Sequence, residues 1–202
     1  MNIWRGERPL ILASQSAARK MLLTGAGIPF EAIPADIDER EIQQSSGIAA
    51  AGDIAAMLAE RKAAYVSLRH PGRYVVGADQ TLALGTRVFN KPTGRAEAAD
   101  QLHALAGQTH ALYSAAVVAC DGATLFADVS VAHMTMRALD DAAIEAYLDA
   151  AGAAVTSSVG AYQLEGLGVH LFELIEGDHF TILGLPLLPL LKFLRGEEMI
   201  AI

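Results

Sequence analysis

The stretch Val75–Thr81, VVGADQT, carries the strongest fold signal in this chain. Apolar residues with high strand propensity are followed by a carboxylate at Asp79 and an amide at Gln80. A second stretch, Leu10–Arg19 (LILASQSAAR), has the same form, because its apolar residues end in a Ser-rich turn that opens a helix. We therefore predict two buried strands with polar residues at or just beyond their ends, where ligands collect in open α/β sheets.

Strand and helix signals alternate along the rest of the chain. An Asp-Gly pair at 121–122 separates two β-rich runs, and such a pair strongly favours an antiparallel hairpin. A polar loop is predicted from the acidic segment 36–41 to Gly47, and Thr93 and Asp140 are predicted helix caps. Alternating helices combined with a hairpin predict a mixed-sheet α/β (α+β) fold. The expected strands cover 10–13, 30–34, 74–78, 110–120, 124–136 and 169–175; the expected helices run from Ser14 or Ser16 to Gly25 or Gly27 and cover 54–68, 95–106, 140–150 and 187–194.

The composition predicts a single domain over residues 1–202. Hydrophobic residues make up 52% of the 202 residues, which is enough for one sizeable core, and no linker-like segment divides the chain. The formal charge of −8 without a basic run argues against a nucleic-acid partner, because such binding depends on Lys and Arg. The apolar run 182–194 is shorter than the roughly 20 residues of a membrane helix, and no signal peptide precedes the first strand. We therefore expect a soluble, cytoplasmic protein with no membrane partner.

Several residues near these strands are suited to a small phosphate ligand. Asp79 can bind Mg²⁺ or Mn²⁺ or orient a water molecule, although a turn cap is an equally common role for such a residue. Lys91 precedes Pro92, which favours an extended backbone, and it is either a phosphate ligand or an exposed surface lysine. Ser14 and Arg19 flank a predicted helix N-terminus, which attracts anions but is also an ordinary place for a serine cap.

A second group of charged residues is more ambiguous. Asp36, Asp38 and Glu39 form the densest acidic cluster, which could coordinate a hard cation, although solvated loop charge is the commoner explanation. Lys62 lies on a predicted helix, where a solvent-facing side chain is the usual explanation. The six histidines show no metal-binding spacing, and none of them is assigned to a metal.

Taken together, these residues make the chain resemble the Maf family, the septum-formation-inhibitor-like nucleoside triphosphate pyrophosphatases. The resemblance extends from about Leu10 to Leu194 and implies a mixed β-sheet flanked by helices, with two lobes around a central cleft. Its pieces occur in the family's order: LASQSAAR, ADIDE, AERKA, VVGADQT, NKP, GQTHALYS, VGAYQLEG and IEGDHFTILGLPL.

The resemblance also implies an activity and a set of site residues. Family members hydrolyse a nucleoside triphosphate between the α- and β-phosphates, and they require a divalent cation, here Mg²⁺ or Mn²⁺. By position, Asp79 is the catalytic base and shares a metal ion with Glu39. Homodimers are common in the family, although no heptad pattern or exposed apolar stripe indicates one here. The implied substrate-binding residues are Ser14, Arg19, Glu39, Lys62, Lys91 and Glu165.

Departures from the usual family pattern bear on the substrate. Ala18 replaces the first arginine of the family's Ser-x-Ser-Pro-Arg-Arg, Gln80 follows the catalytic aspartate, and Glu165 replaces a glutamine. This combination is similar to the family branch that acts on 7-methyl-GTP. Methylation at N7 gives guanine a positive charge, which an anionic Glu165 favours over a neutral pyrimidine. Against this assignment, Ala18 lacks the aromatic ring which that branch carries at this position.

The same departures support a second interpretation. Ala18 and Ser158 stand where the family usually has cations, so the chain could be a nucleotide-binding regulator of cell division without turnover. A phosphatase that releases orthophosphate is a third interpretation. The product formed from a panel of nucleotides distinguishes all three.

Overall fold

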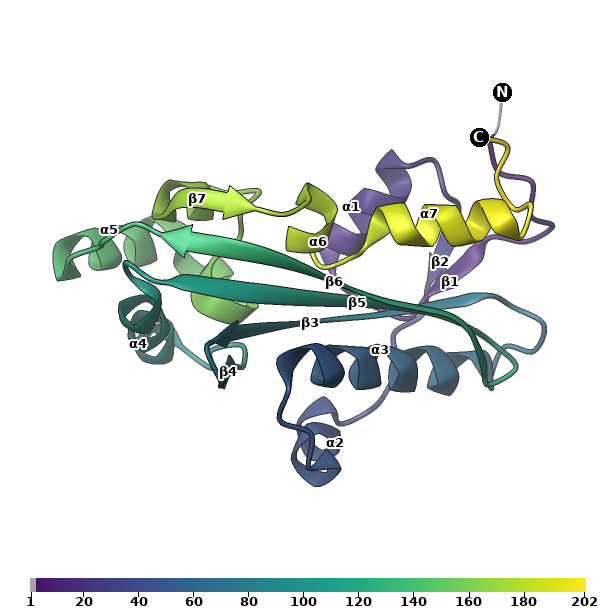
Figure 1. The fold of residues 1–202 in the computed structure, drawn as a ribbon, viewed down its shortest axis with the longest axis horizontal. Coiled ribbons are helices and arrows are strands. Elements are labelled where there is room, and N and C mark those ends of the chain that lie inside the picture. Colours follow the sequence, from purple (N-terminus) through teal and green to yellow (C-terminus); the bar gives the residue numbers. More distant parts are fainter. Residues whose placement is uncertain (1–2) are drawn as a thin grey trace.

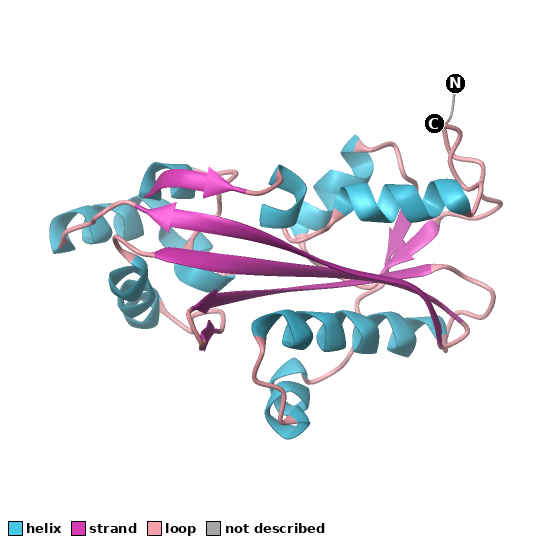
Figure 2. Cartoon of the chain, viewed as in Figure 1, coloured by secondary structure: helices cyan, strands magenta, loops and turns pink. Residues whose placement is uncertain are grey.

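A mixed seven-stranded sheet lies at the centre of the computed structural model, which describes residues 3–202 (Figures 1 and 2). The order across the sheet is β2-β1-β3-β5-β6-β7, and β4 also pairs with β3. β1 is parallel to β2 and β3, whereas the other pairs are antiparallel, which confirms the predicted α/β class. The strands are β1 (Leu10–Leu12), β2 (Phe30–Ala32), β3 (Val75–Leu84), β4 (Arg87–Phe89), β5 (Thr109–Cys120), β6 (Ala123–Met136) and β7 (Phe172–Glu176).

Helices cover both faces of the sheet (Figure 1). The long helix α3 packs on one face, while α1, α6 and α7 lie over the other, and α4 and α5 lie towards one end of the long strands. Within residues 3–202, no helix is long and apolar enough to span a bilayer. The helices are α1 (Ala17–Gly25), α2 (Glu39–Ser46), α3 (Ala51–Ser67), α4 (Arg95–Leu105), α5 (Asp141–Ala151), α6 (His179–Ile182) and α7 (Leu187–Gly196).

Contact between α3 and the sheet depends on small residues. Ala55, Ala59 and Ala63 of α3 are fully buried against alanine and valine side chains of β5. Gly77 of β3 lies so close to the helix that a Cβ atom there would be 2.1 Å from the carbonyl oxygen of Ala59. Only glycine at position 77 allows α3 and β3 to lie this close, because real Cβ contacts essentially never fall below 3.0 Å.

The predicted hairpin and two predicted helix caps are confirmed. Asp121 and Gly122 both have positive φ angles, +50° and +82°, as a two-residue hairpin turn between right-twisted strands requires. The Ser16 hydroxyl accepts a hydrogen bond from the Arg19 amide and caps α1, and Asp140 caps α5 through the Ala143 amide. Helices after these caps therefore begin where the sequence places them.

Four predictions about local structure are wrong. The loop predicted through Gly47 is the polar helix α2, which Asp38 caps by accepting a hydrogen bond from the Glu41 amide. The N-cap of α4 is Gly94, while Thr93 lies outside and hydrogen-bonds the Glu97 carboxylate.

The other two errors concern strands. The strand predicted over 169–175 begins only at Phe172, because Leu167–Leu171 form a 3₁₀ turn. The strand predicted to end at Ala78 continues to Leu84, since β5 pairs with it as far as Ala83. Asp79 is consequently in the middle of a strand rather than at or beyond its end.

Candidate active site

The site forms along a part of β3 that lacks a strand on one side. β5 follows one edge of β3 from Val75 to Ala83, so β1 and β4 share the other edge. On that edge, β1 pairs with β3 only as far as Val76, and β4 pairs with β3 only from Leu82 onward. The part of β3 between Val76 and Leu82, which has no strand on this edge, borders a cavity of about 1080 Å³. All seven predicted site residues line this cavity: Ser14, Arg19, Glu39, Lys62, Asp79, Lys91 and Glu165.

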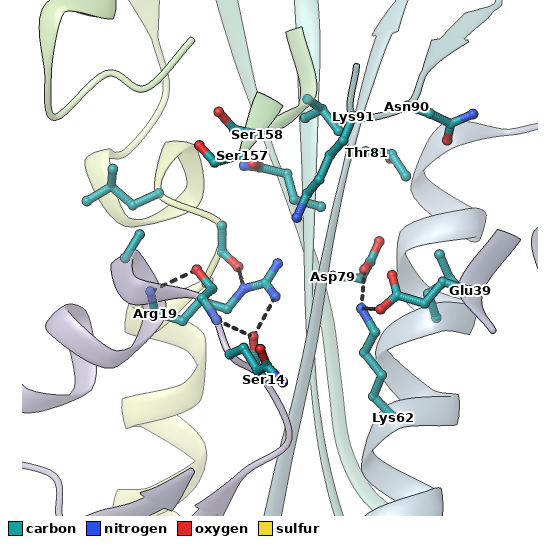
Figure 3. A pocket seen from close by; sticks show the side chains of 18 of the residues that line it. Ser14, Arg19, Glu39, Lys62, Asp79, Thr81, Asn90, Lys91, Ser157 and Ser158 are labelled. Atoms are coloured by element: carbon teal, nitrogen blue, oxygen red, sulfur yellow. Dashed lines mark hydrogen bonds and ion pairs between the residues drawn. The ribbon is translucent and has the colours of Figure 1, made fainter. Parts of the chain in front are cut away.

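One wall of the cavity carries two carboxylates bridged by a lysine (Figure 3). The Lys62 ammonium lies 2.6 Å from Asp79 Oδ1 and 2.9 Å from Glu39 Oε1. Lys62 is only 7% exposed, so of the two interpretations of this residue the solvent-facing side chain is wrong. Its burial follows from the close approach of α3 to β3 at Gly77, which brings Lys62 level with Asp79.

Burial also changes the acidity of Asp79. Desolvation raises the pKa of the Asp79 carboxyl above its usual value, while the positive charges of Lys62 and Arg19 act in the opposite direction. A raised pKa brings a carboxylate closer to the range in which it can accept a proton at neutral pH. Burial thus makes the Asp79 carboxylate a stronger base than an exposed aspartate.

The opposite wall carries Ser14 and Arg19 (Figure 3). The Arg19 guanidinium is held in place by neutral acceptors: Nε donates to the Gly184 carbonyl at 2.7 Å, and Nη1 donates to the Ala78 carbonyl at 2.9 Å and to Ser14 Oγ at 3.1 Å. The Ala78 carbonyl is on the open edge of β3, so Arg19 satisfies a backbone group that a neighbouring strand would otherwise bind. Three bonds to separate segments fix the orientation of the guanidinium.

Arg19 forms no ion pair with a carboxylate of residues 3–202, and its Nη2 atom has no hydrogen-bond partner among them. Desolvation lowers the pKa of Arg19, but a guanidinium stays charged at any physiological pH. A half-buried cation without a carboxylate partner is suited to an anionic ligand. The Arg19 wall can thus bind phosphate oxygens.

Two loops complete the cavity. Lys91 follows β4, and its ammonium extends into the space between the two walls (Figure 3). Ser157 and Ser158 come from the loop that also carries Glu165, whose exposed side chain lies at the rim. The Ser158 hydroxyl donates to the Tyr162 carbonyl, which folds this loop back on itself.

Comparison with known proteins identifies the family. The Maf-like protein family profile matches residues 9–197. The chain belongs to the Maf family. A Rhodopseudomonas palustris protein named nucleoside triphosphate pyrophosphatase is 65% identical over the full length of both chains, and a Bradyrhizobium diazoefficiens protein of the same name is 66% identical over the full length of both. A Brucella abortus protein named 7-methyl-GTP pyrophosphatase is 53% identical over 194 residues, which cover 95% of this chain and 97% of that protein.

Gln101, whose role the sequence did not predict, organises the site of this Maf protein from outside the cavity. Its buried side-chain amide donates to the Asn90 carbonyl, next to Lys91, and accepts from the Gly160 amide in the second loop. The residue thus ties together the two loops that bring Lys91 and Glu165 to the cavity. A glutamine on an amphipathic helix carries no sequence signal for this role.

Gln80 is a further structural residue whose contacts the sequence did not predict. Its side-chain nitrogen lies within 3.1 Å of Ser114 Oγ and of the Thr181 and Ile182 carbonyls, all on the face of the sheet opposite α3. Successive residues of a strand point to opposite faces, so Asp79 meets α3 while Gln80 meets α6. Gln80 thereby anchors the α6 segment next to the Gly184 carbonyl that holds Arg19.

The donor set of the site fits a divalent cation only in part. Asp79 and Glu39 supply hard oxygen ligands of the kind Mg²⁺ and Mn²⁺ prefer, and Mg²⁺ is commonly held by one or two carboxylates together with substrate phosphates. No group of three or more His, Cys, Asp or Glu side chains is arranged to hold a metal among residues 3–202. The site of this Maf protein thus fits a cation that brings phosphate ligands with it.

Proposed function

We propose that this Maf protein hydrolyses a nucleoside triphosphate between its α- and β-phosphates and releases pyrophosphate and a nucleoside monophosphate. One observation carries the proposal: a cavity has a base-bearing wall at Asp79 and, opposite, a cation at Arg19 without a carboxylate partner. The names of the full-length relatives agree with this activity. The cavity volume of about 1080 Å³ also accommodates a nucleotide, since small-molecule sites commonly measure about 300–1,000 Å³.

Each wall has a separate task in the proposed reaction. Arg19, Ser14 and Lys91 bind the phosphate chain and compensate the charge that develops on the leaving pyrophosphate. Asp79 orients a water molecule and accepts its proton as the water oxygen bonds to the α-phosphorus and the bond to the bridging oxygen breaks. Lys62 and Glu39 hold Asp79 in position. Asp79 and Glu39 would hold a divalent cation that arrives with the nucleotide, and this cation would further neutralise the phosphate charge.

We propose that Glu165 determines which nucleobase the site prefers. It is exposed at the rim of the cavity, where its carboxylate can face a purine edge. A carboxylate attracts the positively charged 7-methylguanine ring and can accept hydrogen bonds from its N1–H and amino groups. The substrate is therefore proposed to be 7-methyl-GTP, the nucleotide in the name of the Brucella abortus relative.

A nucleotide panel tests the activity. Purified protein with Mg²⁺ or Mn²⁺ is given 7-methyl-GTP, GTP, dTTP, UTP or CTP, and pyrophosphate, orthophosphate and monophosphate are quantified. Equimolar pyrophosphate and monophosphate are expected, most rapidly from 7-methyl-GTP. Orthophosphate as the first product would indicate a phosphatase, and nucleotide binding without any turnover would indicate the regulatory protein.

The role of Asp79 has a direct test. Asp79→Asn keeps the size of the side chain but removes its charge and basicity, so we expect pyrophosphate release to fall about 10²–10⁴-fold. Asp100→Asn is a matched control, because Asp100 is exposed on α4 and does not line the cavity. Circular dichroism and thermal unfolding verify that both variants fold. An Asp79→Asn protein as active as the control would contradict the proposed base.

A further inference from the structure

Lys62 lies where a cation shared by Asp79 and Glu39 would bind. Its ammonium is 2.6 Å from one carboxylate and 2.9 Å from the other, and its side chain is 9% exposed (Figure 3). The charge of Lys62 therefore already offsets one of the two negative charges of this carboxylate pair. A metal ion entering between the same two oxygens would meet a positive charge a few ångströms away, and the repulsion would be little screened at a buried position.

The helix fixes Lys62 in this position. The backbones of α3 and β3 are in close contact at Ala59 and Gly77, so the helix cannot shift towards the strand. The neighbouring Ala63 is fully buried against the sheet, so the backbone at Lys62 has little freedom to move away. A rearrangement of the Lys62 side chain would break its buried ion pair with Asp79 and its half-exposed ion pair with Glu39.

We propose that the free protein holds no divalent cation and that the cation enters as a complex with the triphosphate. Until then, Lys62 is the counter-ion that keeps Asp79 and Glu39 together. The phosphate oxygens supply the ligands that the protein lacks, and their negative charge offsets the repulsion between the metal and Lys62. This inference rests on the proposed function, since it names the form in which the nucleotide binds.

The first test measures metal binding without catalysis. Mn²⁺ is titrated into the protein and followed by the electron paramagnetic resonance signal of the free ion, with and without an α,β-methylene nucleoside triphosphate that cannot be cleaved. Titrations of the same nucleotide with protein absent provide the correction for Mn²⁺ held by nucleotide alone. The corrected Mn²⁺ affinity is expected to rise at least about ten-fold when nucleotide is bound, and by linkage Mn²⁺ must raise nucleotide affinity by the same factor. One Mn²⁺ per chain bound equally tightly without nucleotide would overturn the proposal.

The second test removes the positive charge of Lys62. Lys62→Met keeps an apolar stem of similar length but leaves Asp79 and Glu39 unbridged, so Mn²⁺ should bind the nucleotide-free variant about ten-fold more tightly than it binds the unaltered protein. Lys192→Met is the matched control, since Lys192 is exposed on α7 and outside the cavity. Unchanged Mn²⁺ affinity in a folded Lys62→Met protein would refute the role of Lys62.

These outcomes separate the two proposals. Mn²⁺ titration of the nucleotide-free proteins needs neither nucleotide binding nor turnover, so it reports on Lys62 alone. Failure of the proposed function would appear instead as absent pyrophosphate release by the unaltered protein. A nucleotide-independent metal site in an active enzyme would refute only the inference about metal entry.

Discussion

Gly77→Ala should damage the site without altering any residue that touches a ligand. An added Cβ would lie 2.1 Å from Ala59 O and 2.7 Å from Ala63 N, whereas acceptable contacts begin at 3.0 Å. α3 would have to retreat by about 1 Å, at a cost of about 1–3 kcal/mol in the free energy of unfolding. If the Lys62 ammonium moved with the helix, its 2.6 Å bond to Asp79 would stretch beyond hydrogen-bonding distance. Misplacement by about 1 Å can cost about 10²-fold in rate.

Two measurements check this prediction. Urea unfolding followed by circular dichroism gives the loss of stability, and the rate of pyrophosphate release gives kcat/KM. Gly25→Ala at the end of α1 is the control, because nothing lies within 4 Å of its added Cβ, so its free energy of unfolding should change by less than about 0.5 kcal/mol. A Gly77→Ala protein with unchanged stability and full activity would show that contact between Gly77 and α3 is not needed to hold Lys62 at Asp79.

Three further predictions concern charged and titratable side chains. Arg19→Lys removes the planar fork that binds two carbonyls, so kcat/KM for pyrophosphate release should fall about 10–100-fold. Glu165→Gln should reduce the preference for 7-methyl-GTP over GTP about ten-fold, measured as the ratio of kcat/KM values, and an unchanged ratio would exclude Glu165 from base selection. Burial lowers the pKa of His110 from 6.5 to about 4, so the unfolded chain binds more protons across that window and the free energy of unfolding should rise by up to about 3 kcal/mol between pH 4 and 6.5. His110→Gln should flatten that rise in urea titrations.

The sequence predicted those parts of the fold that depend on local chemistry. The hairpin turn at Asp121-Gly122 needs two positive φ angles, and Ser16 and Asp140 supply the oxygens that helix N-termini need. Each of these signals is complete within a few residues. The helix α2 was missed because its mostly polar sequence has no buried residue and so lacks the apolar periodicity by which helices are recognised.

The structure places the predicted site residues in one cavity, but the sequence did not predict their contacts. β3 continues through Asp79 because β5 pairs with it there, and this partner lies more than thirty residues away in the chain. The sequence left open whether Lys62 faces solvent, because the close approach of α3 depends on Gly77, a glycine whose role is visible only in three dimensions. Gln101, likewise, acts through contacts with Asn90 and Gly160, which belong to two loops far apart in the sequence.

The alternation of side chains along β3 explains how an acidic chain can build a site for an anion. The net charge is −8, yet Asp79 points to the face where Lys62 balances it, so this carboxylate repels a phosphate less than a free one would. On the open edge of the same strand, the Ala78 carbonyl helps to hold Arg19, whose charge no carboxylate of residues 3–202 pairs with. Two adjacent residues of one strand thus present a carboxylate that Lys62 neutralises and a carbonyl that positions the Arg19 cation, and the local field of the cavity differs from the field of the whole protein.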